Sequence, residues 1–172
     1  MRTERFPKHV RIPLNDRGKN DTGVDKMPAP YIRRVYYYET DKMGIMHHSN
    51  YIRIFEETRV FFLRQAGMPF ESIEAQGVLM PVLSVDCRYI RPLRFDEEFS
   101  VDLTITRFNG VKLFVEYKVT NTATGELCAE GNSSHCFTDE ELIPIRVKHK
   151  YPNIYNIFAD NMEQDTDCKK ID

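Results

Sequence analysis

The hydrophobic period of this chain changes once, and that change limits the folds available to it. Over residues 50–67, NYIRIFEETRVFFLRQAG, apolar residues recur at helical spacing, which predicts one long amphipathic helix that Gly67 ends. From residue 83 onward, apolar and polar residues alternate, as they do in half-buried strands. The alternating apolar positions are Leu83, Val85, Cys87 and Tyr89, then Phe99, Val101, Leu103 and Ile105, then Val111, Leu113, Val115, Tyr117 and Val119. A helix followed by strands, without βαβ repeats, predicts the α+β class with an antiparallel sheet.

Local signals place the remaining elements. The run IRRVYYY at 32–38 predicts a first strand, and FESIEAQG at 70–77 predicts a short second helix. Asn109-Gly110 predicts a two-residue type I′ hairpin, because both central positions of that turn need positive φ. A last strand follows NTATGE at 121–126. We therefore expect a strand, a long helix and then four strands in an antiparallel meander.

Length and composition favour one ordinary globular domain in 172 residues. We expect an extended lead-in over 1–30, the folded domain over 31–140 and a C-terminal extension over 141–172. No apolar run is long enough for a membrane span or a secretory signal, so we expect a cytoplasmic protein. Residues 1–30 lack a helix-turn-helix pattern, and no nucleic-acid partner is expected. The cysteines lack metal-ligand spacing, so we expect free thiols and no metal site at Cys87, Cys128, Cys136 and Cys168.

The turn between the first strand and the long helix, YYYETDKMGIMHHSNY at 36–51, is the candidate site. A helix N-terminus offers free N–H groups and a positive dipole end. If Gly44 bends the chain there, an N–H near His48 could face a substrate carbonyl, unless Ser49 or Asn50 caps the helix. Asp41, expected on the same side as Glu39, could then act as nucleophile or general base. Ordinary turn chemistry would favour the same residue types.

The spacing of the residues in this turn resembles a known pattern. The positions that match a known active-site pattern are Arg34, Val35, Thr40, Asp41, Gly44, Ile45, His48 and Tyr51, with Met46 where valine is usual. FEETR in the helix and CRYIRPLRFDEEFSV in the strands fit the same family. Over about residues 32–138 the chain resembles the 4-hydroxybenzoyl-CoA thioesterase-like branch of the hotdog-fold superfamily, which includes the Tol-Pal-associated acyl-CoA thioesterases.

This resemblance implies a hotdog fold, in which an antiparallel sheet wraps around one long central helix. It implies a thioesterase that cleaves an acyl-CoA or acyl-carrier thioester, with Asp41 as the catalytic carboxylate and a backbone N–H at His48 polarising the carbonyl. It also implies a homodimer, or a dimer of dimers, whose sheets pair edge to edge with active sites at the interface. No metal or redox cofactor is expected, and coenzyme A enters as part of the substrate.

Further candidates surround this centre. Substrate contacts are expected from Gly44, Ile45, Tyr51 and Glu57. Glu57 is expected toward the apolar face of the helix, where it needs an ion-pair partner or lines the pocket. The candidate cations for coenzyme A phosphates are Arg88, Arg91, Arg94, Arg107 and Lys112. Pocket depth is expected to depend on Tyr51, Phe55, Phe62, Met80 and Val82.

Three further residues and two alternative functions complete the sequence-based expectations. We expect Arg59 at the surface or an interface, and structural roles for His135 and Cys136. Two other functions remain open from the residues: a non-catalytic acyl-CoA-binding hotdog protein, and a hotdog dehydratase, although dehydratases use a histidine with a helix acid. The Thr40-Asp41 turn fits thioesterases better.

Overall fold

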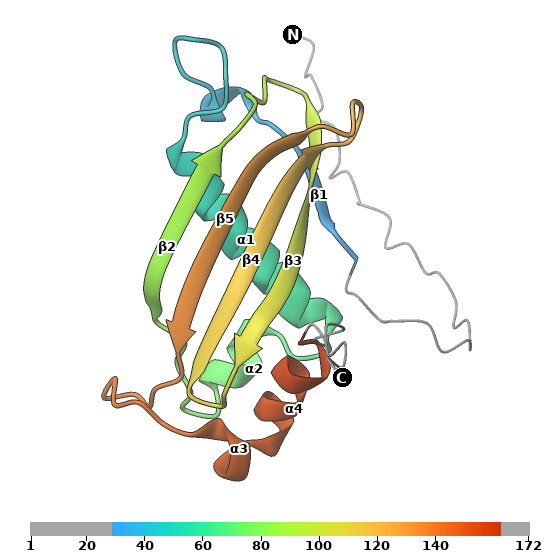
Figure 1. The fold of residues 1–172 in the computed structure, drawn as a ribbon. Coiled ribbons are helices and arrows are strands. Elements are labelled where there is room, and N and C mark those ends of the chain that lie inside the picture. The colour runs from blue at the N-terminus through green and yellow to red at the C-terminus, as the bar shows by residue number, and fades with distance from the viewer. Residues whose placement is uncertain (1–28, 163–172) are drawn as a thin grey trace, which may run out of the picture.

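The computed structural model describes residues 29–162, so most of the expected lead-in, the end of the C-terminal extension and Cys168 lie outside the described residues. In this range the chain forms one five-stranded antiparallel sheet with the long helix α1 lying across one of its faces (Figure 1). This arrangement confirms the α+β class and the hotdog fold. The elements are β1 (Tyr31–Arg34), a 3-10 turn (Tyr37–Glu39), α1 (Ser49–Gln65), α2 (Phe70–Glu74), β2 (Val82–Tyr89), β3 (Glu98–Phe108), β4 (Lys112–Asn121), β5 (Leu127–Cys136), α3 (Val147–Lys150) and α4 (Pro152–Asp160).

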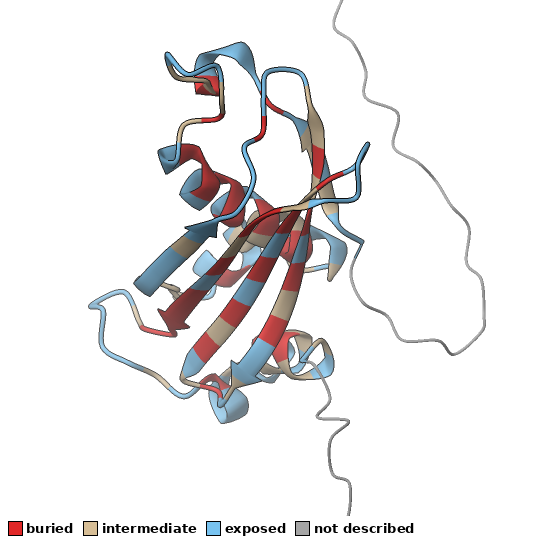
Figure 2. Cartoon of the chain, turned by 45° about the horizontal axis from the view of Figure 1, so that its top comes forward, coloured by how far each residue is buried: buried red, intermediate tan, exposed pale blue. Residues whose placement is uncertain are grey.

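The core lies between α1 and the sheet. Ile54 and Phe55 of α1 are fully buried, and the Phe55 ring stacks on Tyr117 of β4 with their centroids 4.3 Å apart. Burial alternates along the central strands, so one face of the sheet is covered (Figure 2). Gly131 of β5 makes room for this packing, because a Cβ there would lie 2.3 Å from the Phe55 ring. The predicted helix and the alternation in β3 and β4 are therefore confirmed.

The strand order differs from the expected meander. It runs β1-β3-β4-β5-β2, so only β3, β4 and β5 follow one another in space. β2 pairs with β5 at the sheet edge, with Val82 opposite His135 and Tyr89 opposite Ala129. Residues 90–97 then carry the chain to β3, between β1 and β4. Hydrophobic period predicts which segments are strands, but it does not determine their neighbours.

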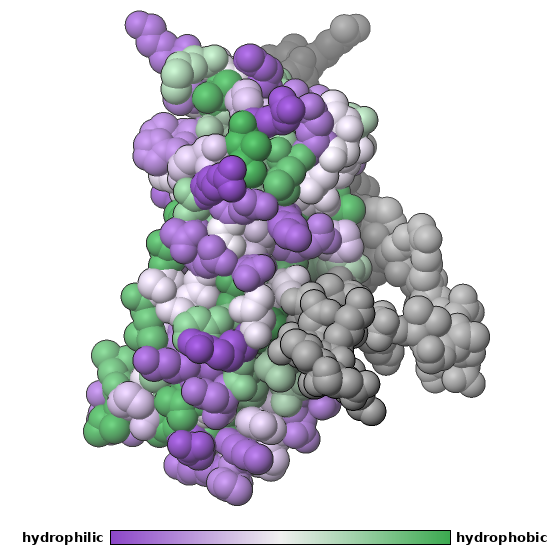
Figure 3. Space-filling view, in the orientation of Figure 1, coloured by the Kyte–Doolittle hydropathy of each residue, from purple (hydrophilic) through white to green (hydrophobic). Residues whose placement is uncertain are grey.

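β2 is also more exposed than its alternation predicts. Its apolar side chains stay open to solvent because it is an edge strand, and Leu83 and Tyr89 are 52% and 50% exposed. In the space-filling view, hydrophobic atoms follow this edge of the molecule (Figure 3). The prediction of a half-buried β2 is wrong for the single chain.

The first strand ends earlier than IRRVYYY predicts. β1 stops at Arg34, and Tyr37–Glu39 form a 3-10 turn instead. The Glu39 carboxylate accepts a hydrogen bond from the Tyr36 N–H at 2.9 Å, which bends the chain back on itself. Tyr37 and Tyr38 consequently project into solvent. Because residues 37–39 are not a strand, the strand alternation that was expected to place Asp41 on the same side as Glu39 is absent.

The β3–β4 connection is a hairpin, but not a type I′ turn. Gly110 has a φ of +79°, whereas Asn109 is not among the residues with positive φ. The Asn109 side chain instead accepts hydrogen bonds from the N–H groups of Val111 and Lys112, at 3.0 and 2.8 Å. An Asn side chain that bonds its own loop in this way stabilises the turn without the left-handed conformation that Asn109-Gly110 predicted for it.

The C-terminal helices α3 and α4 pack at the hairpin end of the sheet (Figure 1). Ile154 is fully buried, and the Phe158 ring lies 5.3 Å from Phe137 and 5.5 Å from Phe108. Aromatic residues of this segment thus dock on the sheet. Among the described helices, none has the length and apolarity to cross a bilayer.

Candidate active site

The turn before α1 is a small, closely bonded hairpin around Asp41. The Asp41 N–H donates to the Ile45 carbonyl at 3.0 Å, and the Gly44 N–H donates to the Asp41 carbonyl at 2.9 Å. Gly44 has a φ of +72°, a conformation that a residue with a side chain rarely adopts. The Asp41 Oδ1 accepts the Met43 N–H at 2.8 Å, which leaves the other carboxylate oxygen without a described partner. The carboxylate is therefore held in one orientation.

Two contacts fix this hairpin to the rest of the fold. The Met46 N–H donates to the Leu93 carbonyl at 2.7 Å, which ties the turn to the loop between β2 and β3. The His47 N–H donates to the Glu39 carbonyl at 2.8 Å. The turn is thereby anchored on both sides, so Asp41 does not depend on a free loop for its position.

The start of α1 is not capped by either residue that the sequence suggested. The Ser49 hydroxyl lies 2.8 Å from Nδ1 of His47, and the Asn50 amide donates to the Glu39 carbonyl at 2.8 Å. The first helical bonds run from the Asn50 N–H to His47 and from the Tyr51 N–H to His48. Within residues 29–162, no hydrogen bond has the His48 N–H as its donor. A free N–H at a helix N-terminus suits a negatively charged or polarised oxygen.

A cavity of about 310 Å³ opens at this point. Five predicted site residues line it together with an edge-strand tyrosine that the sequence did not indicate: Asp41, Ile45, His48, Tyr51, Arg91 and Tyr89. Tyr51 is buried, its ring centroid lies 5.1 Å from that of Tyr89, and burial raises the pKa of its hydroxyl. The carboxylate, the helix N-terminus and an aromatic wall thus share one cavity.

Glu39 is a site-supporting residue whose role the sequence analysis missed. It is only 6% exposed, and its two carboxylate oxygens bind the Arg33 guanidinium at 2.7 and 2.8 Å. Burial raises the pKa of Glu39, but the hydrogen bonds from Arg33 and Tyr36 outweigh burial, so the net pKa is lowered. An acid paired with Arg33 could be found only from the fold, because nothing local marks it.

Glu57 lies away from this cavity. Its side chain is 44% exposed and lines a different surface hollow, so its expected position on the apolar face is wrong. Helix positions 54, 55 and 58 carry the buried face, and residue 57 points beside it. The expected ion pair is present, because Glu57 accepts hydrogen bonds from Arg33 Nε and the Tyr31 hydroxyl, both at 3.0 Å.

The candidate cations divide between the two ends of the sheet. Arg91 lines the Asp41 cavity and pairs with Glu126 at 3.3 Å, and Arg94 lies beside Gly44. The remaining three are placed as follows: Arg88 pairs with Glu130 near the Asp41 end, whereas Arg107 covers the Phe114 ring and Lys112 begins β4, both at the hairpin end. The single chain therefore does not bring all five together.

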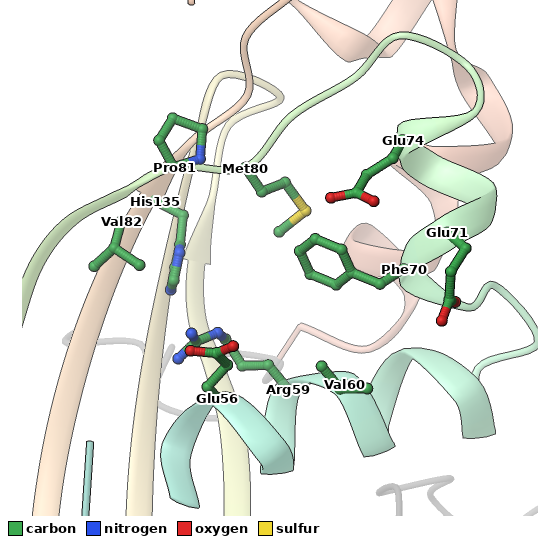
Figure 4. A pocket seen from close by; sticks show the side chains of 10 residues that line it. All are labelled: Glu56, Arg59, Val60, Phe70, Glu71, Glu74, Met80, Pro81, Val82 and His135. Atoms are coloured by element: carbon green, nitrogen blue, oxygen red, sulfur yellow. The ribbon is translucent and has the colours of Figure 1, made fainter. Parts of the chain in front are cut away.

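A second cavity, of about 460 Å³, lies beside α1 toward its C-terminal half (Figure 4). Among its lining residues are Glu56, Arg59 and Val60 from α1, Phe70 from α2, Met80 and Val82 around the start of β2, and His135 from β5. Of the five residues on which pocket depth was expected to depend, only Tyr51 lines the Asp41 cavity. Met80 and Val82 line this second cavity instead, and Phe55 and Phe62 belong to the core.

A hydrogen-bonded chain of side chains links two residues that line this second cavity, Arg59 and His135. Arg59 donates to the Tyr117 hydroxyl at 2.9 Å, that hydroxyl lies 2.8 Å from Ser133 Oγ, and Ser133 Oγ lies 2.8 Å from His135 Nε2. Burial, with the nearby Arg59 charge, lowers the pKa of His135 to about 4. Arg59, expected at the surface or an interface, is thus half-buried. His135 is neutral at neutral pH, and the structural role expected of it stays a prediction.

An antiparallel sheet around one long helix, with a carboxylate in the turn that starts the helix, defines the class of hotdog-fold thioester hydrolases. The family model of the thioesterase-like superfamily matches residues 35–149, and the chain belongs to this superfamily.

Individual relatives agree with this assignment. The chain is 34% identical over 125 residues to the "Putative acyl-CoA thioesterase YneP" of Bacillus subtilis, a match that covers 72% of this chain and 90% of the relative. It is 28% identical over 88 residues to the acyl-CoA thioester hydrolase YbgC of Escherichia coli O157:H7, covering 51% of this chain and 66% of the relative.

Solved structures resemble the fold. The structure of a hypothetical protein from Aquifex aeolicus superposes with a TM-score of 0.69 at 32% identity, over 76% of this chain and 99% of that one. A DHNA-CoA thioesterase from Staphylococcus aureus reaches a TM-score of 0.72 at 24% identity, over 76% and 88% of the two chains. The second likeness concerns the fold alone.

Proposed function

We propose that this chain hydrolyses an acyl-CoA thioester, with Asp41 as the reacting carboxylate and the His48 N–H as the oxyanion donor. The observation that carries the proposal is their shared cavity: Asp41 lines it, and so does His48, whose N–H donates no hydrogen bond within residues 29–162. The names of the Bacillus and Escherichia relatives support acyl-CoA as the substrate class. Ile45 and Tyr51 line the cavity around the thioester, Gly44 shapes the turn that holds Asp41, and Arg91 is the candidate cation for coenzyme A that lines this cavity.

The chemistry follows from these parts. The His48 N–H donates to the thioester oxygen and stabilises the negative charge that develops there, an effect typically worth about a hundredfold to a thousandfold in rate. Asp41 either attacks the carbonyl carbon, giving an anhydride that water cleaves, or takes a proton from water as that water attacks. In both routes the C–S bond breaks, the thiolate leaves and takes up a proton, and the products are a free acid and coenzyme A. Water is the only co-reactant, so we propose that no resident cofactor is needed.

The proposal includes a second copy of the chain. β2 is an edge strand, and the backbone groups on its outer side have no partner strand in the described sheet. Its apolar side chains Leu83 and Val85 are also exposed. Antiparallel pairing of two β2 strands about a two-fold axis would satisfy those groups and cover these side chains. We propose this homodimer as the functional unit.

The test is release of free thiol from a panel of acyl-CoAs, with wild type compared with Asp41→Asn. We expect turnover on some members of the panel and a loss of about a hundredfold or more in the variant, since the carboxylate takes part in bond making. Asp102→Asn, an exposed acid on β3, is the matched control and keeps wild-type turnover. Unchanged turnover in folded Asp41→Asn overturns the assignment of Asp41, and binding without turnover in wild type favours an acyl-CoA-binding protein.

A further inference from the structure

Tyr89 reaches the candidate active site from the edge strand of the sheet. It is the last residue of β2, where its backbone pairs with Ala129 of β5. Directly after it, the N–H groups of Ile90 and Arg91 both donate to the Cys128 carbonyl, at 2.8 and 3.0 Å. The backbone that carries the Tyr89 side chain is therefore fixed to the sheet both at the strand end and just beyond it.

The Tyr89 hydroxyl bonds to the residue at which α1 begins. It donates to the His48 carbonyl at 3.2 Å, and the same carbonyl accepts the Tyr51 N–H at 3.3 Å in the first turn of the helix. Among the side chains of residues 29–162, that of Tyr89 alone bonds to the main chain of His48. The helical bond is longer than usual, so a side chain from the sheet supplements it at this end of α1.

The packing and the protonation state of Tyr89 suit it as a donor. Its ring centroid lies 5.1 Å from that of Tyr51 at an interplanar angle of 72°, and 6.4 Å from that of His48 at 74°, so two edge-to-face contacts orient the ring. Burial, with the nearby Cys87 thiol, raises the pKa of the Tyr89 hydroxyl above its ordinary value. The hydroxyl therefore keeps its proton at neutral pH and can donate to the His48 carbonyl.

The N–H and the carbonyl of His48 lie on either side of one Cα, so fixing the two peptide groups fixes the direction of the N–H. The peptide that carries the N–H is held through its His47 carbonyl, which accepts the Asn50 N–H at 3.0 Å. The peptide that carries the carbonyl is held by Tyr51 and Tyr89. Without the Tyr89 bond, this second peptide loses its link to the sheet, and rotation about the φ and ψ of His48 becomes easier.

We infer that Tyr89 is a positioning residue for thioester hydrolysis: its bond to the His48 carbonyl holds the His48 N–H in the direction that meets the developing oxyanion beside Asp41. This inference rests on the proposed function, to which it adds a residue of the edge strand. Tyr89 acts through His48 and not on the reacting atoms. Its loss therefore lowers the rate of the chemical step more than it weakens substrate binding.

The first experiment compares kcat and KM for acyl-CoA hydrolysis in wild type and Tyr89→Phe. Phenylalanine keeps the ring contact with Tyr51 and loses only the hydroxyl. We expect kcat to fall by about tenfold and KM to change by less than about twofold, because a displaced oxyanion donor weakens transition-state binding. Tyr155→Phe is the matched control: it removes a hydroxyl from α4, at the hairpin end of the sheet, and leaves both constants unchanged (Figure 1). Thermal unfolding checks that both variants are folded.

A second experiment observes the His48 N–H directly and does not depend on activity. The chain has 5 histidines, so selective ¹⁵N-histidine labelling gives a simple spectrum of backbone amides, and the signal that disappears in His48→Gln is that of His48. In Tyr89→Phe the His48 amide signal shifts, whereas the signals of His135 and His149 stay in place. In Tyr155→Phe the His48 signal does not move.

The outcomes separate this inference from the function on which it rests. If wild type hydrolyses no acyl-CoA, the proposed function fails, and the role in hydrolysis fails with it. If wild type is active and depends on Asp41 while Tyr89→Phe keeps its kcat, the inference is wrong and the function stands. A raised KM with unchanged kcat makes Tyr89 a substrate-binding residue and also overturns the inference. So does a loss of kcat without any change in the His48 amide signal, because Tyr89 would then act by another route.

A double variant tests whether Tyr89 and Asn50 hold the same group. The Asn50 amide reaches this turn through the Glu39 carbonyl, at 2.8 Å. If both side chains orient the His48 N–H, Asn50→Ala combined with Tyr89→Phe lowers kcat by less than the product of the two single losses, since the second change displaces a donor that the first has already displaced. Losses that multiply in full would contradict a shared target and overturn the inferred route through His48.

Discussion

The side-chain amide of Asn50 donates to the main-chain carbonyl of Glu39 at 2.8 Å. This bond joins the first turn of α1 to the 3-10 turn that follows β1. The same carbonyl also accepts a hydrogen bond from the His47 N–H. It is therefore bonded by one residue before His48 and by one residue after it. The position of the free His48 N–H relative to Asp41 therefore depends on a contact between residues eleven positions apart.

Replacing Asn50 with alanine removes this link. We expect kcat/KM for thioester hydrolysis to fall by about tenfold to a hundredfold, because small misplacements of an oxyanion donor are costly. Stability falls by only about 1 kcal/mol, since the Glu39 carbonyl keeps its bond from His47. Steady-state kinetics and urea unfolding measure the two effects. Ser49→Ala, an exposed neighbour, is the control, and an equal loss of activity in it would contradict the role of Asn50.

Two acids, Glu39 and Glu57, bind Arg33, and we predict that they contribute unequally to the free energy of unfolding. Glu39→Gln leaves a half-buried guanidinium without its bidentate partner, and we expect a loss of about 2–4 kcal/mol in the free energy of unfolding. Glu57→Gln removes a largely solvent-exposed partner and costs less than about 1 kcal/mol. Urea unfolding at neutral pH compares them, and similar losses for the two variants would refute the dominance of Glu39.

Gly131 is predicted to tolerate no side chain. A Cβ there would lie 2.3 Å from Phe55 Cε2 and 2.9 Å from the Asp86 carbonyl, so Gly131→Ala forces α1 or β2 to shift. We expect a destabilisation of about 3 kcal/mol, at the upper end of overpacking effects. Combining it with Phe55→Leu should cost less than the sum of the two single changes, because the smaller side chain vacates the space. A strictly additive double variant would argue against this contact.

His135 makes stability depend on pH. Its folded pKa is about 4 and its ordinary value is 6.5, so between these values the unfolded chain binds a proton that the folded chain does not. Stability contributed by the neutral ring is complete above pH 6.5 and is lost as the pH falls toward 4, by up to about 3 kcal/mol. Urea unfolding across this window measures the slope. His135→Gln should reduce the slope, whereas the exposed His149→Gln should retain it.

Sequence patterns predicted the elements that depend on neighbours along the chain. The period over residues 50–67 gave the position of α1, and the positive φ of Gly67 agrees with its predicted role at the helix end. The turn around Asp41 was also recognisable, because its residue types and spacing are local. Predictions failed where a distant partner intervenes, as when β2 pairs with β5 at the sheet edge and its apolar side chains stay exposed.

The sequence by itself determined the helix, most of the strands and the turn that holds Asp41, because period and turn chemistry act over a few residues. Only the tertiary structure decided that β2 lies at the edge beside β5, that Tyr89 and Arg91 line the same cavity as Asp41, and that Glu57 does not. These outcomes depend on how strands pair and how α1 packs on them. Such contacts join residues far apart in the chain, and they form only when the whole sheet closes over the helix.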